Sequence, residues 1–148
     1  MNVYEAAWTE ALERELIRLS ADWEAEGSCR GYRTNTREDL AGRRLFLAED
    51  GGKLVGYCFG LRETAEKDST VMKAGTPYFE LEELYVVPAR RSQGIGRKLF
   101  ESAEQTAREE GLAFVMVSTA TKNARAILHF YLDELGMSFW SARLFKEL

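Results

Sequence analysis

The chain has 148 residues, of which 45% are hydrophobic and 30% charged, and its formal net charge is −4. This composition is ordinary for one globular domain and argues against a broadly basic nucleic-acid-binding face. No apolar run reaches the ~20 residues of a membrane-spanning helix. We therefore expect a single domain over residues 1–148, with no nucleic-acid or membrane partner.

The counts of cysteine and histidine bear on the compartment and on metal binding. Two cysteines, Cys29 and Cys58, and one histidine, His129, form neither a disulfide framework nor a metal-ligand pattern. We expect no metal site, reduced thiols and a cytoplasmic location. Cys58 lies in an apolar run and is expected in the core, and helical phase places His129 on the surface.

The first half of the chain predicts two helices and a hairpin. Apolar residues recur every three or four positions from Trp8, as they do on one face of a helix. Thr36 is a residue type that caps helices, and Asp50-Gly51-Gly52 between two apolar runs is a hairpin signal. We therefore expect, in order, an edge strand within 1–6, a helix over 8–26, a loop over 27–35, a short helix over 36–40, strands over 43–49 and 53–61, and a connecting loop over 62–77.

Residues 80–111 predict a strand, a tight basic turn and a long helix. Pro88 ends the strand because proline has no N–H group for a sheet ladder. The helix that follows begins with four unpaired backbone N–H groups and a partial positive charge. Gly94 and Gly96 lack a Cβ atom and let a ligand approach the backbone, and basic side chains flank the turn. The stretch therefore predicts an anion site suited to a pyrophosphate.

Two common phosphate motifs do not fit this turn. A P-loop requires Gly-Lys-Ser/Thr, whereas Gly96 is followed by Arg97 and Lys98. A dinucleotide fingerprint requires a third glycine where Leu99 stands, which disfavours a nucleotide-binding α/β domain. A turn that uses glycine only for packing remains the alternative to a phosphate site.

The last third of the chain predicts a strand, a helix and further strand. The apolar run over 112–119 suits a strand buried on both faces and parallel to the strand before Pro88. Asn123 caps a helix that Gly136 ends, and residues 137–148 form one last strand or two short ones. The order of elements indicates an α/β fold (α+β, mixed sheet) with helices on both faces of the sheet.

The turn and its surroundings resemble a known family. Arg91-x-x-Gly94-x-Gly96 behind a strand that ends in Val-Val-Pro resembles the pyrophosphate motif of the GNAT superfamily of acyl-CoA N-acyltransferases, and the resemblance spans roughly residues 36–148. It implies a mostly antiparallel sheet with one splayed parallel strand pair that holds an acyl-CoA. It also implies transfer of an acetyl group from acetyl-CoA to a primary amine of a small molecule or peptide, by direct attack in a ternary complex. An inactive acyl-CoA-binding sensor or regulatory module stays open as an alternative, as does a homodimer.

The resemblance also assigns cofactor-binding residues. Three strand residues would pair their backbone with the pantetheine arm, the turn would hold the pyrophosphate, and an asparagine at the next helix would contact the cofactor. These residues are Leu84, Tyr85 and Val86, then Arg91, Ser92, Gln93, Gly94, Ile95, Gly96 and Arg97, and finally Asn123.

The catalytic residues implied by the resemblance are a glutamate base and a tyrosine acid. Strand alternation puts Glu80 and Glu82 on the face of Leu84 and Val86, with Glu83 opposite, unless a bulge interrupts the strand. We expect the base to be Glu82, then Glu80, then Glu83; solvated carboxylates that only attract a cationic amine are the alternative.

Tyr131 resembles the tyrosine that faces the thioester sulfur. It follows Asn123 by eight residues, one more than the usual family spacing, at which Phe130 stands instead. Helical phase favours Tyr131, and a core aromatic is its structural alternative. An acceptor pocket would be walled by aromatic residues: Trp23, Tyr32, Tyr57 and Tyr78.

Overall fold

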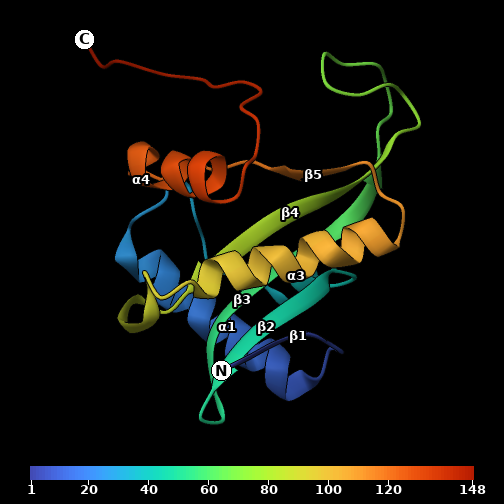
Figure 1. The fold of residues 1–148 in the computed structure, drawn as a ribbon. Helices are drawn as coiled ribbons and strands as arrows, with labels where there is room; N and C mark the ends of the chain where they lie inside the picture. The colour runs from blue at the N-terminus through green and yellow to red at the C-terminus, as the bar shows by residue number, and fades with distance from the viewer.

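The computed structural model describes residues 1–148 as a five-stranded sheet with helices on both faces (Figure 1). The strands lie in the order β1-β2-β3-β4-β5, antiparallel except for the parallel β4–β5 pair. The elements are β1 (Asn2–Ala6), α1 (Glu10–Glu26), α2 (Arg37–Leu40), β2 (Arg44–Asp50), β3 (Lys53–Thr64), β4 (Pro77–Val86), the 3₁₀ turn η1 (Pro88–Arg90), α3 (Ile95–Glu109), β5 (Phe114–Val117), α4 (Ala124–Leu128) and the π-helix η2 (His129–Glu134).

Two apolar cores hold the helices to opposite faces of the sheet. On one face, α1 and α2 contribute Leu16, Leu19 and Leu40 to a core that includes Tyr57 and Tyr85. On the other face, the predicted apolar stripe of α3 packs with Phe46, Cys58 and Tyr131. Burial of these side chains is the main stabilising term of the fold, at about 25 cal/mol per Å² of apolar surface.

Local signals place the helix ends where the sequence predicts them. The Thr9 side chain accepts a hydrogen bond from the Leu12 N–H at 3.1 Å, and Gly27 ends α1 in the left-handed region. Thr36 and Asp39 form a reciprocal capping box that starts α2, as expected from Thr36. The predicted edge strand, hairpin and parallel β4–β5 pair are also confirmed.

Two predictions about the C-terminal third are wrong. The strand over 112–119 contains only Phe114–Val117, and none of its residues is fully buried, because β5 is the last strand of the sheet. The strand or strands predicted over 137–148 are absent, because no other strand pairs with these residues in a ladder. None of the helices is both long enough and apolar enough to cross a lipid bilayer.

Candidate active site

A cleft opens where β4 and β5 separate. The two strands pair from Tyr78–Phe114 to Leu81–Val117, and β4 then continues to Val86 against β3 alone. Beyond Leu81, the edge of β4 that faced β5 has no strand partner. The cleft has a volume of about 920 Å³, within the range of ligand pockets.

A β-bulge on β4 sets which side chains face the cleft. Glu83 pairs with Phe59 and Leu81 with Gly60, so that Glu82 is the extra residue. After the bulge, Tyr85 packs on the α1 face whereas Val86 packs on the α3 face. Glu83 bonds Tyr57 of the α1 face and lies opposite Val86, as predicted, whereas Glu80, between Phe79 and Leu81 of the α3 face, is not on the predicted face.

The backbone between η1 and α3 leaves a row of amides free. Ser92 and Gly94 have positive φ values of 58° and 79°, which turn the chain sharply into α3. No backbone N–H from Ser92 to Arg97 donates to another protein group, and no side chain caps the helix. These amides, at the positive end of a helix, form a cradle for an anion.

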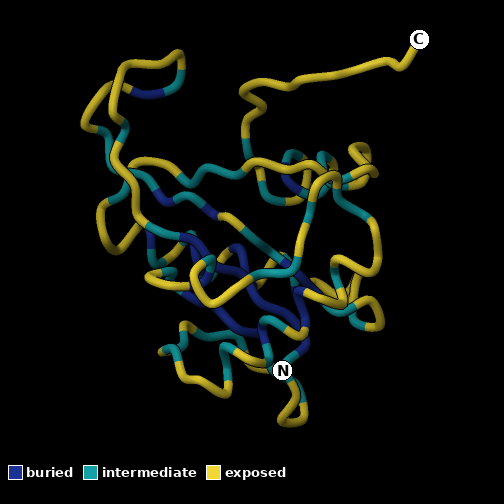
Figure 2. Tube along the Cα trace, turned by 180° about the vertical axis from the view of Figure 1, so that it is seen from behind, coloured by how far each residue is buried: buried dark blue, intermediate teal, exposed yellow.

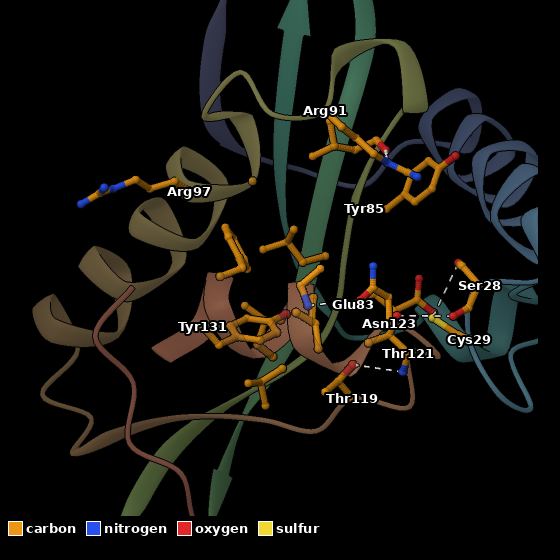
Figure 3. A pocket seen from close by; sticks show the side chains of 18 of the residues that line it. Ser28, Cys29, Glu83, Tyr85, Arg91, Arg97, Thr119, Thr121, Asn123 and Tyr131 are labelled. Atoms are coloured by element: carbon orange, nitrogen blue, oxygen red, sulfur yellow. Dashed lines mark hydrogen bonds between the residues drawn. The ribbon is translucent and has the colours of Figure 1, made fainter. Parts of the chain in front are cut away.

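Basic side chains surround the cradle, but several are already paired. Arg91 donates to the Val86 carbonyl at 2.8 Å and to Glu26 at 2.9 Å, as Figure 3 shows in part. Arg90 pairs with Asp50 and Arg97 with Glu101, each at 2.8 Å. The three arginines line the cleft, whereas Lys98 does not. The free amides are therefore the groups here that could donate hydrogen bonds to an anion without breaking a protein contact.

Glu83 lines the cleft (Figure 3), and its carboxylate is at the centre of a polar network that extends behind the cleft wall. It accepts hydrogen bonds from the Tyr57 hydroxyl at 2.9 Å, the Tyr32 hydroxyl at 3.2 Å and the Asn35 amide at 2.9 Å. Burial raises the pKa of Glu83 above its usual value, the three hydrogen bonds oppose that rise, and Glu82 adds to it. The network links α1, the loop that follows it, β3 and β4, because Ser20 also bonds Tyr32 at 2.7 Å.

The other two glutamates are placed differently. Glu82 lines the cleft, but Arg43 holds it with Nε at 3.1 Å and 3.2 Å from its two oxygens. Glu80 is half-buried and does not line the cleft; burial, then Glu82 and Glu63, raise its pKa. Of the predicted bases, Glu82 and Glu83 therefore meet in the cleft and Glu80 stands outside it.

Tyr131 is buried at 8% exposure and lines the cleft (Figure 3). Its hydroxyl makes no hydrogen bond to the protein, and burial, followed by Cys58 and Cys29, raises the pKa of Tyr131 to about 12. It lies in the π-helix η2, in which the Leu135 N–H donates to the Phe130 carbonyl, five residues earlier. The wider π turn accommodates the extra residue between Asn123 and Tyr131.

The remaining predicted residues are divided between the cleft and other surroundings. Asn123 caps α4 by accepting from the Ala126 N–H at 3.2 Å, and it lines the cleft. Trp23 is also in its wall, stacked on Tyr85 at 5.2 Å between ring centroids. His129 is exposed, as expected, and pairs with Asp133. The other predicted cofactor residues in the lining are Leu84, Tyr85, Val86, Arg91, Ser92, Gly94, Ile95, Gly96 and Arg97, whereas Gln93 is not in it.

One wall of the cleft has no counterpart in the sequence predictions. The backbones of Cys29 and Thr121 form an isolated antiparallel β-bridge, and the Arg30 N–H donates to the Ala120 carbonyl at 2.9 Å. This contact joins the loop after α1 to the loop after β5, and Ser28, Cys29 and Thr121 line the cleft. The sequence contains no periodic pattern from which a pairing between segments about ninety residues apart could be predicted.

Comparison with known proteins agrees with this architecture. A search of curated proteins finds no significant match. Solved structures with a similar fold include an aminoglycoside acetyltransferase, meta-AAC0020, from an uncultured soil metagenomic sample. The two chains are 19% identical and superpose with a TM-score of 0.68, and the alignment covers 99% of this chain and 95% of that chain. Aminoglycoside N-acetyltransferase AAC(6')-Iy in complex with CoA has 17% identity and a TM-score of 0.67, over 99% and 98% of the two chains.

A third structure with the same fold carries a different description. It is a transcriptional regulator from Bacillus halodurans C-125, with 20% identity and a TM-score of 0.72 over 99% of this chain and 100% of that chain. The family model described as "Acetyltransferase (GNAT) family" matches residues 2–137. That match covers the sheet, the cradle and Tyr131, and the chain belongs to the GNAT acetyltransferase family.

Proposed function

We propose that the chain is an N-acetyltransferase that moves an acetyl group from acetyl-CoA to a primary amine of a small molecule or peptide, by direct attack in a ternary complex. The observation that carries this proposal is that one cleft contains both the row of free amides at α3 and the partly buried carboxylate of Glu83. Family membership supports acetyl transfer to amines in general. We assign the reaction to the cytoplasm, where free thiols such as Cys29 and Cys58 persist.

The residues of the cleft fit a CoA thioester. The amides of Ser92 to Arg97 would donate to its diphosphate, and the unpaired edge of β4 at Leu84 to Val86 would bond its pantetheine arm. The Asn123 side chain, whose oxygen caps α4, keeps its amide group for the cofactor. The bound thioester supplies the activated acetyl group.

Glu83 is our first choice for the base. An amine that attacks a thioester must lose a proton, and a partly buried carboxylate with a raised pKa takes up that proton better than one with an ordinary pKa. Glu82 also lines the cleft, but Arg43 lies 3.1 Å from its carboxylate and occupies it in an ion pair. We therefore place Glu83, which the resemblance ranks third, ahead of Glu82 and Glu80.

Tyr131 is our choice for the acid. Its hydroxyl has no protein partner, and its raised pKa keeps it protonated at neutral pH, so that it can donate to a departing thiolate. Phe130 packs against the start of α3, where its ring lies 3.4 Å from the position of a Cβ atom on Gly96. Phe130 has no hydroxyl and therefore shapes the cleft without taking part in proton transfer.

The test is a thiol-release assay with acetyl-CoA and a panel of amines. Aminoglycosides head the panel because two similar structures are aminoglycoside acetyltransferases, and polyamines, amino acids and lysine peptides follow. We expect CoA release that depends on one amine class and that Glu83→Gln strongly reduces. Binding of acetyl-CoA without release for any amine would favour the sensor alternative and contradict the enzymatic proposal.

A further inference from the structure

Arg91 is held by the protein at the edge of β4 that faces the cleft. The Val87 N–H donates to the Val55 carbonyl at 3.0 Å, so the neighbouring Val86 carbonyl points away from β3. The Arg91 Nε–H donates to this Val86 carbonyl at 2.8 Å, and its guanidinium carbon lies 5.4 Å from the centroid of the Tyr85 ring (Figure 3). Arg91 therefore caps the open edge of β4 where the strand meets the cradle.

Glu26, the last residue of α1, holds the same guanidinium from the other side. One of its carboxylate oxygens, Oε1, accepts from Arg91 Nη2 at 2.9 Å and from the Tyr85 hydroxyl at 2.8 Å. Burial raises the pKa of Tyr85 to about 12, and the bond to Glu26 adds to that rise, so the hydroxyl stays protonated and keeps donating. A carboxylate that receives both donors is held more firmly than one in a lone surface ion pair.

The turn that carries the cradle is held in place by polar contacts rather than by the core. Residues 91–94 are exposed, whereas buried residues concentrate in the sheet, as Figure 2 shows, and Ile95 is the first buried residue after Val86. Ser92, whose positive φ turns the chain into the cradle, follows Arg91 directly. A shift of Arg91 would therefore move the first of the free amides.

Glu26 is not among the residues that line the cleft, whereas its two partners, Arg91 and Tyr85, both line it. Any effect of Glu26 on a ligand in the cleft is therefore exerted through these partners. We propose that Glu26 is a positioning residue for CoA, which holds Arg91 against the Val86 carbonyl and so fixes the turn that presents the free amides. The assignment rests on the proposed function, because CoA is the ligand.

The first measurement is a double-mutant cycle on the dissociation constant for CoA, by isothermal titration of the parent, Glu26→Ala, Arg91→Ala and the double variant. We expect Glu26→Ala to weaken CoA binding about tenfold, and the double variant to bind CoA no more weakly than Arg91→Ala alone. An effect that passes through Arg91 can be lost only once, whereas two independent contributions would multiply.

Two further variants separate position from charge and from helix stability. Glu26→Gln keeps an oxygen for both donors and should restore most of the affinity for CoA; tighter binding than in the parent would instead show that Glu26 acts by charge. Glu24→Ala is the matched control, because Glu24 lies in the same last turn of α1 but accepts from the Thr34 hydroxyl, at 3.0 Å, and should leave the affinity unchanged. Thermal unfolding of each variant should have a midpoint near that of the parent, since exposed ion pairs add little stability.

The second measurement uses the ligand-free protein. In ¹⁵N-labelled chains, the Arg91 Nε–H should exchange slowly with solvent in the parent and in Glu24→Ala, and faster in Glu26→Ala, because the held guanidinium is released. Unchanged exchange in Glu26→Ala would overturn the assignment. So would a parent that binds CoA while Glu26→Ala binds it equally well, or losses that multiply in the double variant. A parent that does not bind CoA would contradict the proposed function together with this assignment.

Discussion

Glu83 receives hydrogen bonds from three side chains that lie in two different parts of the chain, Tyr32 and Asn35 after α1 and Tyr57 in β3. Such a network holds the carboxylate in one orientation, and the bulge at Glu82 turns it toward α1. The sequence identifies the three glutamates as candidates. The resemblance ranks Glu82 and Glu80 ahead of Glu83, but a regular strand pattern does not reveal the bulge, which shifts every later side chain on β4 to the other face.

Replacement of Glu83 by glutamine tests its role through the pH dependence of turnover. Because burial raises the pKa of Glu83, the carboxylate becomes a base only as pH rises through that raised value. We expect the acid limb of kcat/KM in the parent to lie above the ordinary glutamate pKa of about 4.3, and Glu83→Gln to lose about 10²-fold or more and flatten this limb. Glu82→Gln is the matched control, and it should leave the acid limb of the kcat/KM profile in place. If Glu82→Gln changes the acid limb and Glu83→Gln does not, the base is Glu82.

The Tyr131 hydroxyl is tested by Tyr131→Phe, which removes one oxygen and leaves the ring packed against Phe100 and Phe130. We expect kcat to fall about 10²-fold with little change in the dissociation constant for CoA, because only proton donation is lost. Steady-state kinetics and calorimetry measure the two quantities. Unchanged kcat would make Tyr131 a packing residue of the core.

At the scale of elements, the cleft depends on two local irregularities, the bulge in β4 and the π-helix η2. The first opens the strand pair beyond Leu81, and the second presents Tyr131 one residue later than a regular helix would. Hydrophobic periodicity predicts the regular elements but does not reveal a single inserted residue within one of them. The strand predicted within 137–148 is wrong because these residues have no ladder partner in the structure, and a strand needs a partner as well as a sequence pattern.

Gly60 is the residue that the bulge requires. A Cβ atom at this position would lie 2.1 Å from the Glu80 carbonyl oxygen, so that the backbone of β3 or β4 would have to move. We expect Gly60→Ala to lower the free energy of unfolding by about 2 kcal/mol or more, by analogy with overpacked cores. Chemical denaturation measures the change.

Gly96→Ala is the control for Gly60→Ala. A Cβ atom there meets Leu84 and Phe130 at 3.4 Å, an ordinary contact, and alanine favours the helix. We expect unchanged or slightly raised stability. Equal destabilisation by both substitutions would show that close approach at the bulge is not the cause.

At the scale of the whole molecule, the order of strands and helices, the parallel pair and the cradle follow from sequence pattern and family resemblance. The contacts that complete the site do not. The bridge between Cys29 and Thr121 and the bonds from Tyr32 and Asn35 to Glu83 join distant segments, and each depends on how loops pack rather than on local propensity. Sequence therefore predicts the end of the cleft at α3 better than the end at Glu83.

The central claim is that the amides from Ser92 to Arg97 bind the diphosphate of CoA. Gly96→Glu places a negative charge at the start of α3, where it favours the helix but repels a diphosphate. Isothermal titration of CoA and of pantetheine, which has no diphosphate, into the parent and into Gly96→Glu tests this directly. We expect saturable binding of CoA to the parent, at least ~10-fold weaker binding of pantetheine, and no CoA binding by the folded variant. Absence of CoA binding by the parent, or equal affinity for pantetheine, would contradict the account.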